Sequence, residues 1–215
     1  MATARPTSPP VAVPHHEPAG TGAYLRLVGW ASVLAPAAVL LHELGHWVAG
    51  RALGYPAVLE AGSVSGGAQL GAAPGWHVAL QAGAGPAVSI ALTLFALASI
   101  RRNANALWAL ALAAAAPLRF LVVAVSLSVD FAVAVLGGTR GVPNFDEYNF
   151  AAGIGLPPYP VCLAAVAFLF WTWWNVWKRL PERRWLSLMM VIIGVALGMT
   201  LWFQVLGPLV VTLFR

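Results

Sequence analysis

Five long apolar runs dominate the pattern of hydrophobic and polar positions along the chain, and short polar or glycine-rich stretches separate them. A helix needs about 20 mainly apolar residues to cross the hydrocarbon layer of a membrane. The runs therefore predict an all-α polytopic membrane protein with about five transmembrane helices. They lie over about 24–50, 76–100, 106–137, 159–177 and 185–206.

The third run is longer than one span needs, and it contains Pro117. Proline interrupts a helix because it lacks the backbone N–H and clashes with the preceding turn. One tilted or kinked span is the simplest interpretation, and two short spans, each marginal in length, are the alternative.

Residues 54–75 are too short and too rich in glycine to span a membrane. Two short strand-like pieces, Ala57–Leu59 and Gly67–Leu70, flank a turn of glycine and serine, which predicts a β-hairpin or a re-entrant loop. Irregular backbone at membrane depth is tolerated only where protein covers it or where it lines a water-filled cavity. We therefore expect this loop beside a functional site.

The composition agrees with a membrane protein. Of 215 residues, 60% are apolar and only 9% are charged, with a mean hydropathy of +0.79; soluble domains are about a quarter charged. Residues 1–22 are rich in proline and small polar residues and predict a disordered tail. This leaves 23–215 as a single transmembrane domain.

The net charge of +5 does not indicate a nucleic-acid partner, because the basic residues lie in short loops between apolar runs. With five spans, the basic loops 101–105 and 178–184 fall on one side, which the positive-inside rule assigns to the cytoplasm together with the N-terminus. Segments 54–75 and 138–158 then share the opposite side. All but one of the twelve basic residues are arginine, which favours a bacterial cell membrane.

The second half of the first run contains the sequence HELGH, from His42 to His46. Residues four apart on a helix are separated by one turn and about 40° of rotation, so the two histidines project from one face. Glu43 is rotated by about 100° around the helix from His42, a placement that suits a base acting on a metal-bound water rather than a metal ligand. The pattern is HExxH, in which two histidines bind zinc and the glutamate is the general base.

Ionisable residues at membrane depth are costly and usually functional. Three of them within five residues, at the spacing of metal ligands, predict a metal site rather than simple packing. The only cysteine, Cys162, cannot form a thiolate cluster by itself. The site must therefore use histidine and carboxylate side chains.

A catalytic zinc site has three protein ligands and one open position. The candidates for the third ligand are Asp130, Asp146, Glu147, Glu60 and His77. We favour Asp146, because it follows a break between apolar runs on the side towards which the histidines point. Asp130 is the main rival, unless it forms an ion pair with Arg119 or Arg140.

Asp146 and Glu147 also fit the first turn of a short helix, with Asn144 as its N-cap, and this role is compatible with metal binding. Glu147 and His77 remain possible accessory residues. His77 lies near the beginning of the second span, where anchoring at the membrane interface is the simpler interpretation.

The chain resembles the site-2-protease family of intramembrane zinc metalloproteases. The resemblance covers about 24–150 and rests on HELGH, on Gly85-Pro86 in the next span and on an aspartate about a hundred residues after the histidines. It implies that His42, His46 and Asp146 bind one zinc ion and that Glu43 activates water. Ser89 stands where that family usually has asparagine, and Glu147 follows Asp146 where it usually has glycine.

The resemblance implies a zinc-dependent endopeptidase in the lipid bilayer, acting on a membrane-anchored protein substrate. The alternatives are a membrane protein that binds zinc without proteolysis and a scaffold with a degenerate HELGH. A transporter would be expected to have polar residues on several spans or inverted repeats. Spans four and five are nearly free of ionisable groups.

Overall fold

The structure is a computed structural model that describes residues 21–103, 105–138, 145–181 and 183–214. Within these ranges, five helical segments are long and apolar enough to cross a membrane. The prediction of an all-α polytopic membrane protein is therefore confirmed. The predicted tail, 1–22, lies outside the described residues except for its last two, which already belong to the first helix.

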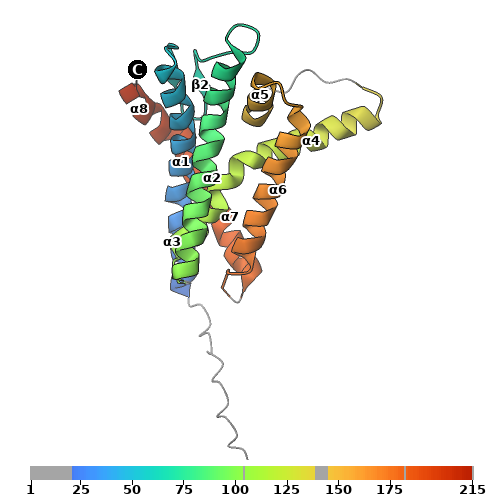
Figure 1. The fold of residues 1–215 in the computed structure, drawn as a ribbon. Helices are drawn as coiled ribbons and strands as arrows, with labels where there is room; N and C mark the ends of the chain where they lie inside the picture. The colour runs from blue at the N-terminus through green and yellow to red at the C-terminus, as the bar shows by residue number, and fades with distance from the viewer. Residues whose placement is uncertain (1–20, 104, 139–144, 182, 215) are drawn as a thin grey trace, which may run out of the picture.

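Four of the long helices begin and end close to the predicted spans (Figure 1). They are α1 (Thr21–Ala52), α2 (Gly75–Arg102), α6 (Pro158–Trp177) and α7 (Arg184–Leu201). The chain after α7 continues as a π-helical turn η2 (Trp202–Leu206), α8 (Gly207–Val211) and η3 (Thr212–Phe214). The fifth candidate span thus reaches Val211 and is longer than the sequence predicted.

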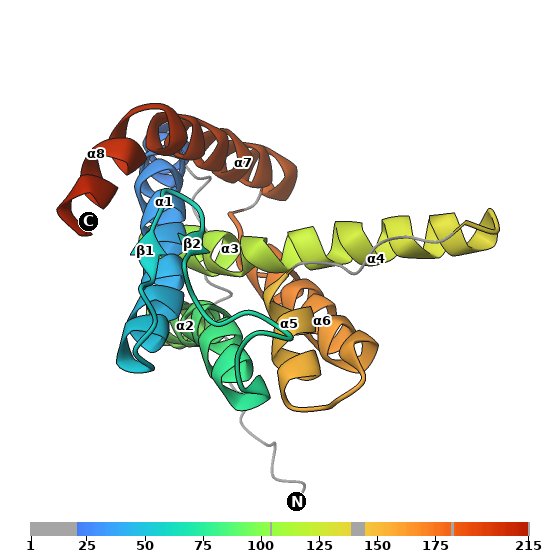
Figure 2. The same cartoon turned by 90° about the horizontal axis from the view of Figure 1, so that it is seen from above.

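The third apolar run is interrupted rather than continuous. It consists of α3 (Leu107–Ala115), a 3-10 turn η1 (Ala116–Leu118) that contains Pro117, and α4 (Arg119–Val135). α3 lies inside the bundle, whereas α4 projects away from it (Figure 2). The kinked interpretation of this run describes the structure, because the proline coincides with the change of direction.

The core is centred on α3. Every residue from Ala109 to Ala115 is buried, and the cluster around them includes residues of α1, α2 and α7. Alanine lets the helix backbones approach closely, as helices in membranes do. Gly194 and Gly198 of α7 do the same against α1, where a Cβ on Gly198 would overlap the Ser32 carbonyl oxygen.

The loop after α1 contains the predicted hairpin, with its second strand earlier than predicted. The strands are β1 (Val58–Leu59) and β2 (Val64–Ser65), and they pair antiparallel. The expected position of the second strand, Gly67–Leu70, was wrong. The Ser63 hydroxyl donates to the Glu60 carboxylate at 2.8 Å and tightens the turn, and Gly66 then ends the strand with a φ of +68°.

The hairpin and the short helix α5 (Asp146–Gly153) lie at the same end of the bundle (Figure 1). α5 packs against the beginning of α2 through glycine on both sides, since a Cβ on Gly75 would overlap the Gly153 carbonyl oxygen. This close approach brings the first turn of α5 next to the second half of α1, where the HELGH sequence lies.

Candidate metal centre

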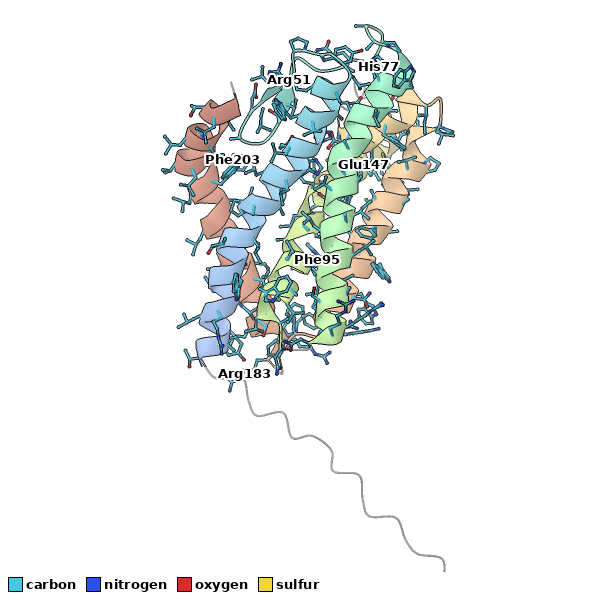
Figure 3. All side chains as sticks on the ribbon, turned by 60° about the vertical axis from the view of Figure 1, so that its left-hand side comes forward. Arg51, His77, Phe95, Glu147, Arg183 and Phe203 are labelled. Carbon is cyan, nitrogen blue, oxygen red and sulfur yellow. The ribbon has the colours of Figure 1, made fainter. Side chains whose placement is uncertain are left out.

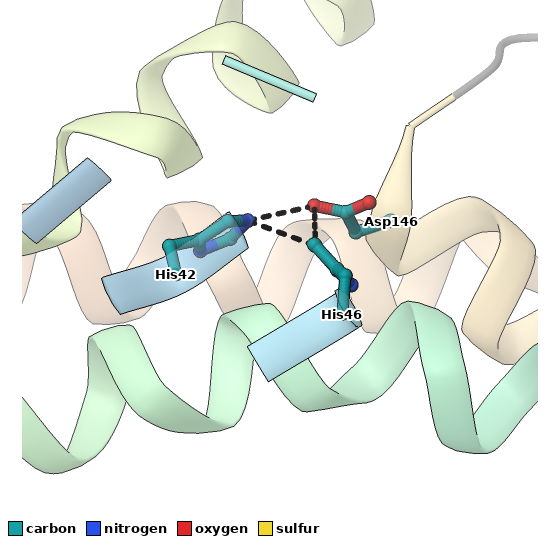
Figure 4. Close-up of side chains that lie close together, drawn as sticks. All are labelled: His42, His46 and Asp146. Atoms are coloured by element: carbon teal, nitrogen blue, oxygen red, sulfur yellow. Dashed lines mark hydrogen bonds and ion pairs between the residues drawn. The ribbon is translucent and has the colours of Figure 1, made fainter. Parts of the chain in front are cut away.

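α1 carries His42 and His46 one turn apart on a buried face. Their exposed fractions are 0% and 6%, and their Nε2 atoms lie 3.1 Å apart. Regular helical geometry alone produces this juxtaposition. Both imidazoles point towards the space between α1 and α5 (Figure 4).

Asp146, the first residue of α5, completes a group of three. Its Oδ2 lies 3.0 Å from His42 Nε2 and 3.2 Å from His46 Nε2 (Figure 4). The short helix predicted here is present, and its N-cap is Phe145 in an extended conformation without a side-chain cap. The N-cap predicted for this helix, Asn144, lies outside the described residues.

The three donor atoms have the spacing of a metal site. In a tetrahedral zinc site with bonds of about 2.0–2.1 Å, ligand atoms are about 3.3–3.4 Å apart. The observed separations of 3.0, 3.1 and 3.2 Å are only slightly smaller. Small movements would therefore let His42, His46 and Asp146 hold a metal ion on three sides.

The other nitrogen of each imidazole has a partner on α2. His46 Nδ1 donates to the Gln81 carbonyl oxygen at 2.7 Å, so a neutral His46 keeps its Nε2 lone pair free. His42 Nδ1 lies 2.9 Å from Ser89 Oγ, which accepts its proton in the same tautomer. Such partners orient metal-binding histidines and make them more basic.

Gly85 of α2 keeps the centre open. A Cβ on this residue would overlap His46 Nε2 and would lie 2.7 Å from His42 Nε2. A Cβ on Gly45 of α1 would lie 2.9 Å from the Ala84 carbonyl oxygen, so the two helices are in close contact at this level. The glycines thus serve helix packing and also leave room for an ion. This cradle and the donor set both fit a metal.

Glu43 is buried beside the histidines, with 1% of its surface exposed. Within the described residues no hydrogen-bond donor reaches its Oε1, while Arg119 Nη2 lies 3.4 Å from that oxygen. Arg119 Nη2 also lies 3.9 Å from Asp146 Oδ2. One guanidinium therefore faces both carboxylates.

The two acidic residues at the start of α5 differ in their pKa. Burial by itself would raise the pKa of Asp146, but the contacts with the imidazoles of His42 and His46 outweigh it and hold the pKa below its ordinary range. Burial raises the pKa of Glu147 to about 7, and the charge of Asp146 acts in the same direction. Asp146 is thus the carboxylate that stays ionised, as a metal ligand must.

The other candidate ligands lie elsewhere. Among the described residues, the only group of three or more that could hold a metal is His42, His46 and Asp146. Glu60 belongs to the hairpin turn. His77 Nδ1 lies 2.7 Å from the Tyr55 hydroxyl, and its ring packs on Trp76, so it joins the ends of α1 and α2 (Figure 3).

Asp130 and Glu147 are also outside this group. Glu147 is buried and lies in the first turn of α5. The sequence left open an ion pair of Asp130 with Arg119 or Arg140. Arg119 forms ion pairs with Glu43 and Asp146, and Arg140 lies outside the described residues.

A polar and small-residue stripe on α2 could have revealed the supporting contacts from the sequence. It consists of buried residues four apart, which therefore share one face of the helix: Gln81, Gly85, Ser89 and Thr93. Three of these touch the histidines or would do so with a Cβ. The polar character of this face within an apolar span was the available signal.

No protein-family model, no curated protein and no solved structure matches this chain.

Proposed function

We propose that the chain is a zinc-dependent intramembrane endopeptidase, similar to the site-2 proteases, that hydrolyses a peptide bond in a membrane-anchored protein. The observation that carries this proposal is that four polar side chains come together inside a bundle of apolar helices. Two histidines of a membrane-spanning helix meet an aspartate 104 residues after the first of them, beside the buried carboxylate of Glu43. The resemblance to that family rests on the same residues.

The donor set favours zinc in a catalytic role. Two imidazoles and one carboxylate are typical of catalytic zinc sites, which leave a fourth position open, whereas structural sites use four protein ligands. The group in the described part of the chain has three members. Zinc bound there would supply a Lewis acid and an acidified water next to Glu43.

The residues of the chain then have separate tasks. Glu43 accepts the proton of the attacking water and delivers it to the nitrogen of the leaving amine. Gln81 and Ser89 hold the two imidazole rings, and Gly85 leaves space for the reacting groups. His42, Glu43 and His46 are buried, and charges interact more strongly in such surroundings than in bulk water.

We also infer that the N-terminus is cytoplasmic and that the protein belongs in a bacterial cell membrane. The basic loops around Arg101 and around Arg183 support this orientation by the positive-inside rule. The metal centre then lies in the half of the bundle away from the cytoplasm. The orientation is tested by introducing single cysteines in the hairpin and in the 178–184 loop and measuring their accessibility in intact cells.

The metal assignment is tested by zinc content in detergent-purified protein. We expect about one zinc ion per chain in the wild type and loss of zinc in His46→Ala and in Asp146→Ala, because each substitution leaves only two ligands. Asp130→Asn is the matched control and should retain zinc. Wild-type protein without zinc, even after reconstitution, would leave a membrane scaffold as the better interpretation.

Proteolysis is tested by comparing protein N-termini in membranes that contain either the wild type or Glu43→Gln. We expect new N-termini within or next to transmembrane segments in the wild type only, since the glutamine cannot accept the proton. Zinc content should be the same in both. If zinc is present and the two sets of N-termini are identical, the protein binds zinc without proteolysis.

A further inference from the structure

Arg119 occupies an unusual position in the chain. It is the first residue of α4, directly after the 3-10 turn that separates α4 from α3. An arginine in the middle of an apolar run is expected to face a partner or a water-filled space rather than lipid. The interruption at Ala116–Leu118 determines where the guanidinium points.

The guanidinium lies between the two carboxylates of the centre. Its Nη2 is 3.4 Å from Glu43 Oε1 and 3.9 Å from Asp146 Oδ2, and about a third of the arginine side chain is exposed. The Glu43 side chain is almost fully buried. A buried carboxylate is strongly unfavourable without a compensating charge, and Arg119 supplies that charge.

The distance between Arg119 Nη2 and Glu43 Oε1 is compatible with Glu43 acting as a base. Charge-assisted N–H···O bonds are about 2.7–2.9 Å long, so a contact of 3.4 Å compensates the charge without a strong hydrogen bond to the oxygen. Oε1 has no hydrogen-bond partner among the described residues and can therefore accept a proton from water. A purely structural ion pair would be expected to be shorter and bidentate.

We infer that Arg119 is the positioning residue for the general base: its guanidinium holds the Glu43 carboxylate beside the metal centre. This inference rests on the proposed function, because Glu43 acts as a base only if the protein is a hydrolase. Arg119 lies at the break in the third span and belongs to none of the sequence motifs. The inference therefore adds a residue to the site that HExxH does not include.

Measuring zinc affinity distinguishes positioning of Glu43 by Arg119 from support of the metal ligand Asp146 by Arg119. Arg119→Gln removes a positive charge close to Asp146, so we expect zinc to bind about tenfold more tightly, measured by competition with a chelator. Arg119→Lys keeps the charge and should change the affinity less than threefold. Arg26→Gln, at the far end of α1 and exposed, is the control and should not change it.

Cleavage should change in the opposite direction. With a membrane segment identified by its Glu43-dependent N-terminus and reconstituted with the enzyme, we expect Arg119→Gln to lower kcat by about a hundredfold or more, with KM changed less than threefold. Arg119→Lys should restore kcat to within about tenfold of the wild type. Tighter zinc binding together with slower cleavage is the expected signature.

Two results would overturn the inference. Loss of zinc together with cleavage in Arg119→Gln, in protein that elutes and melts like the wild type, would make Arg119 a support of the ligands. Unchanged cleavage would remove it from the mechanism. Failure of the proposed function is recognised separately, because the wild type itself would then bind zinc and leave every tested membrane segment intact.

Discussion

At the end of the bundle where α3 begins, the helices meet through alanine, leucine and valine, whereas at the end with the hairpin and α5 they meet around buried polar groups. The first region is the cluster around Ala109–Ala115. The second contains His42, Glu43, His46, Gln81, Ser89 and Glu147. The same helices, α1 and α2, contribute to both.

The apolar and the polar halves of α1 and α2 therefore meet different requirements. Apolar packing in a membrane rests on many small contacts that are individually weak, so shape matters more than any single atom. A buried polar group instead needs a particular partner, and its loss leaves an unsatisfied atom. Substitutions in the first region should affect stability, and those in the second should affect metal binding.

The largest effect is expected at Gly85 in the polar region. Gly85→Ala adds a methyl group that overlaps His46 Nε2, so zinc binding should fall by at least a hundredfold. Zinc content and chelator competition measure it. Gly29→Ala is the matched control, because a Cβ on this residue of α1 has no neighbouring atom within 4 Å. Normal zinc binding in Gly85→Ala would contradict the position assigned to the ion.

The next effect concerns the apolar region. Leu110→Ala removes a side chain that is 1% exposed in the centre of the cluster and should lower the free energy of unfolding by about 2–5 kcal/mol. Reversible unfolding in detergent measures it, with Leu163→Ala, on the exposed face of α6, as control. Zinc content should remain at about one per chain. A loss of zinc in folded Leu110→Ala would mean that the two regions are coupled.

A smaller effect is expected at Ser89. Ser89→Ala removes the partner of His42 Nδ1 and should weaken zinc binding by about tenfold to a hundredfold, as loss of such partners does in other zinc sites. Thr93→Ala, one turn further along α2, removes a hydroxyl that donates to the Ser89 carbonyl oxygen and should keep the affinity within threefold. Equal effects of the two substitutions would argue against orientation of His42 by Ser89.

The smallest effect is expected at the connection between α1 and α2. Tyr55→Phe removes the 2.7 Å contact with His77 Nδ1 and should cost about 0.5–1.5 kcal/mol of stability. Zinc affinity should not change, because His77 lies outside the metal group. If Tyr55→Phe lowered zinc affinity while the fold was retained, His77 would have to be assigned to the centre.

Local patterns accounted for much of the fold and for two of the three residues grouped at the candidate centre. Run length predicted five spans, because crossing a membrane needs a minimum number of apolar residues. Helical periodicity alone places His42 and His46 together. The hairpin was predicted, but its register was not, since the contact of Ser63 with Glu60 and the backbone of Gly66 determine where the second strand pairs.

The sequence by itself thus determined the class of protein, the number of spans and the HExxH pair, all of which depend on residues close together in the chain. The sequence favoured Asp146 among five candidates, but only the tertiary structure brought it to the histidines, brought Arg119 to Glu43 and placed Gly85 and Ser89 against the histidines. These contacts join α1 to residues far away in the sequence. Their geometry depends on how closely glycine lets α1, α2 and α5 approach, which no local pattern specifies.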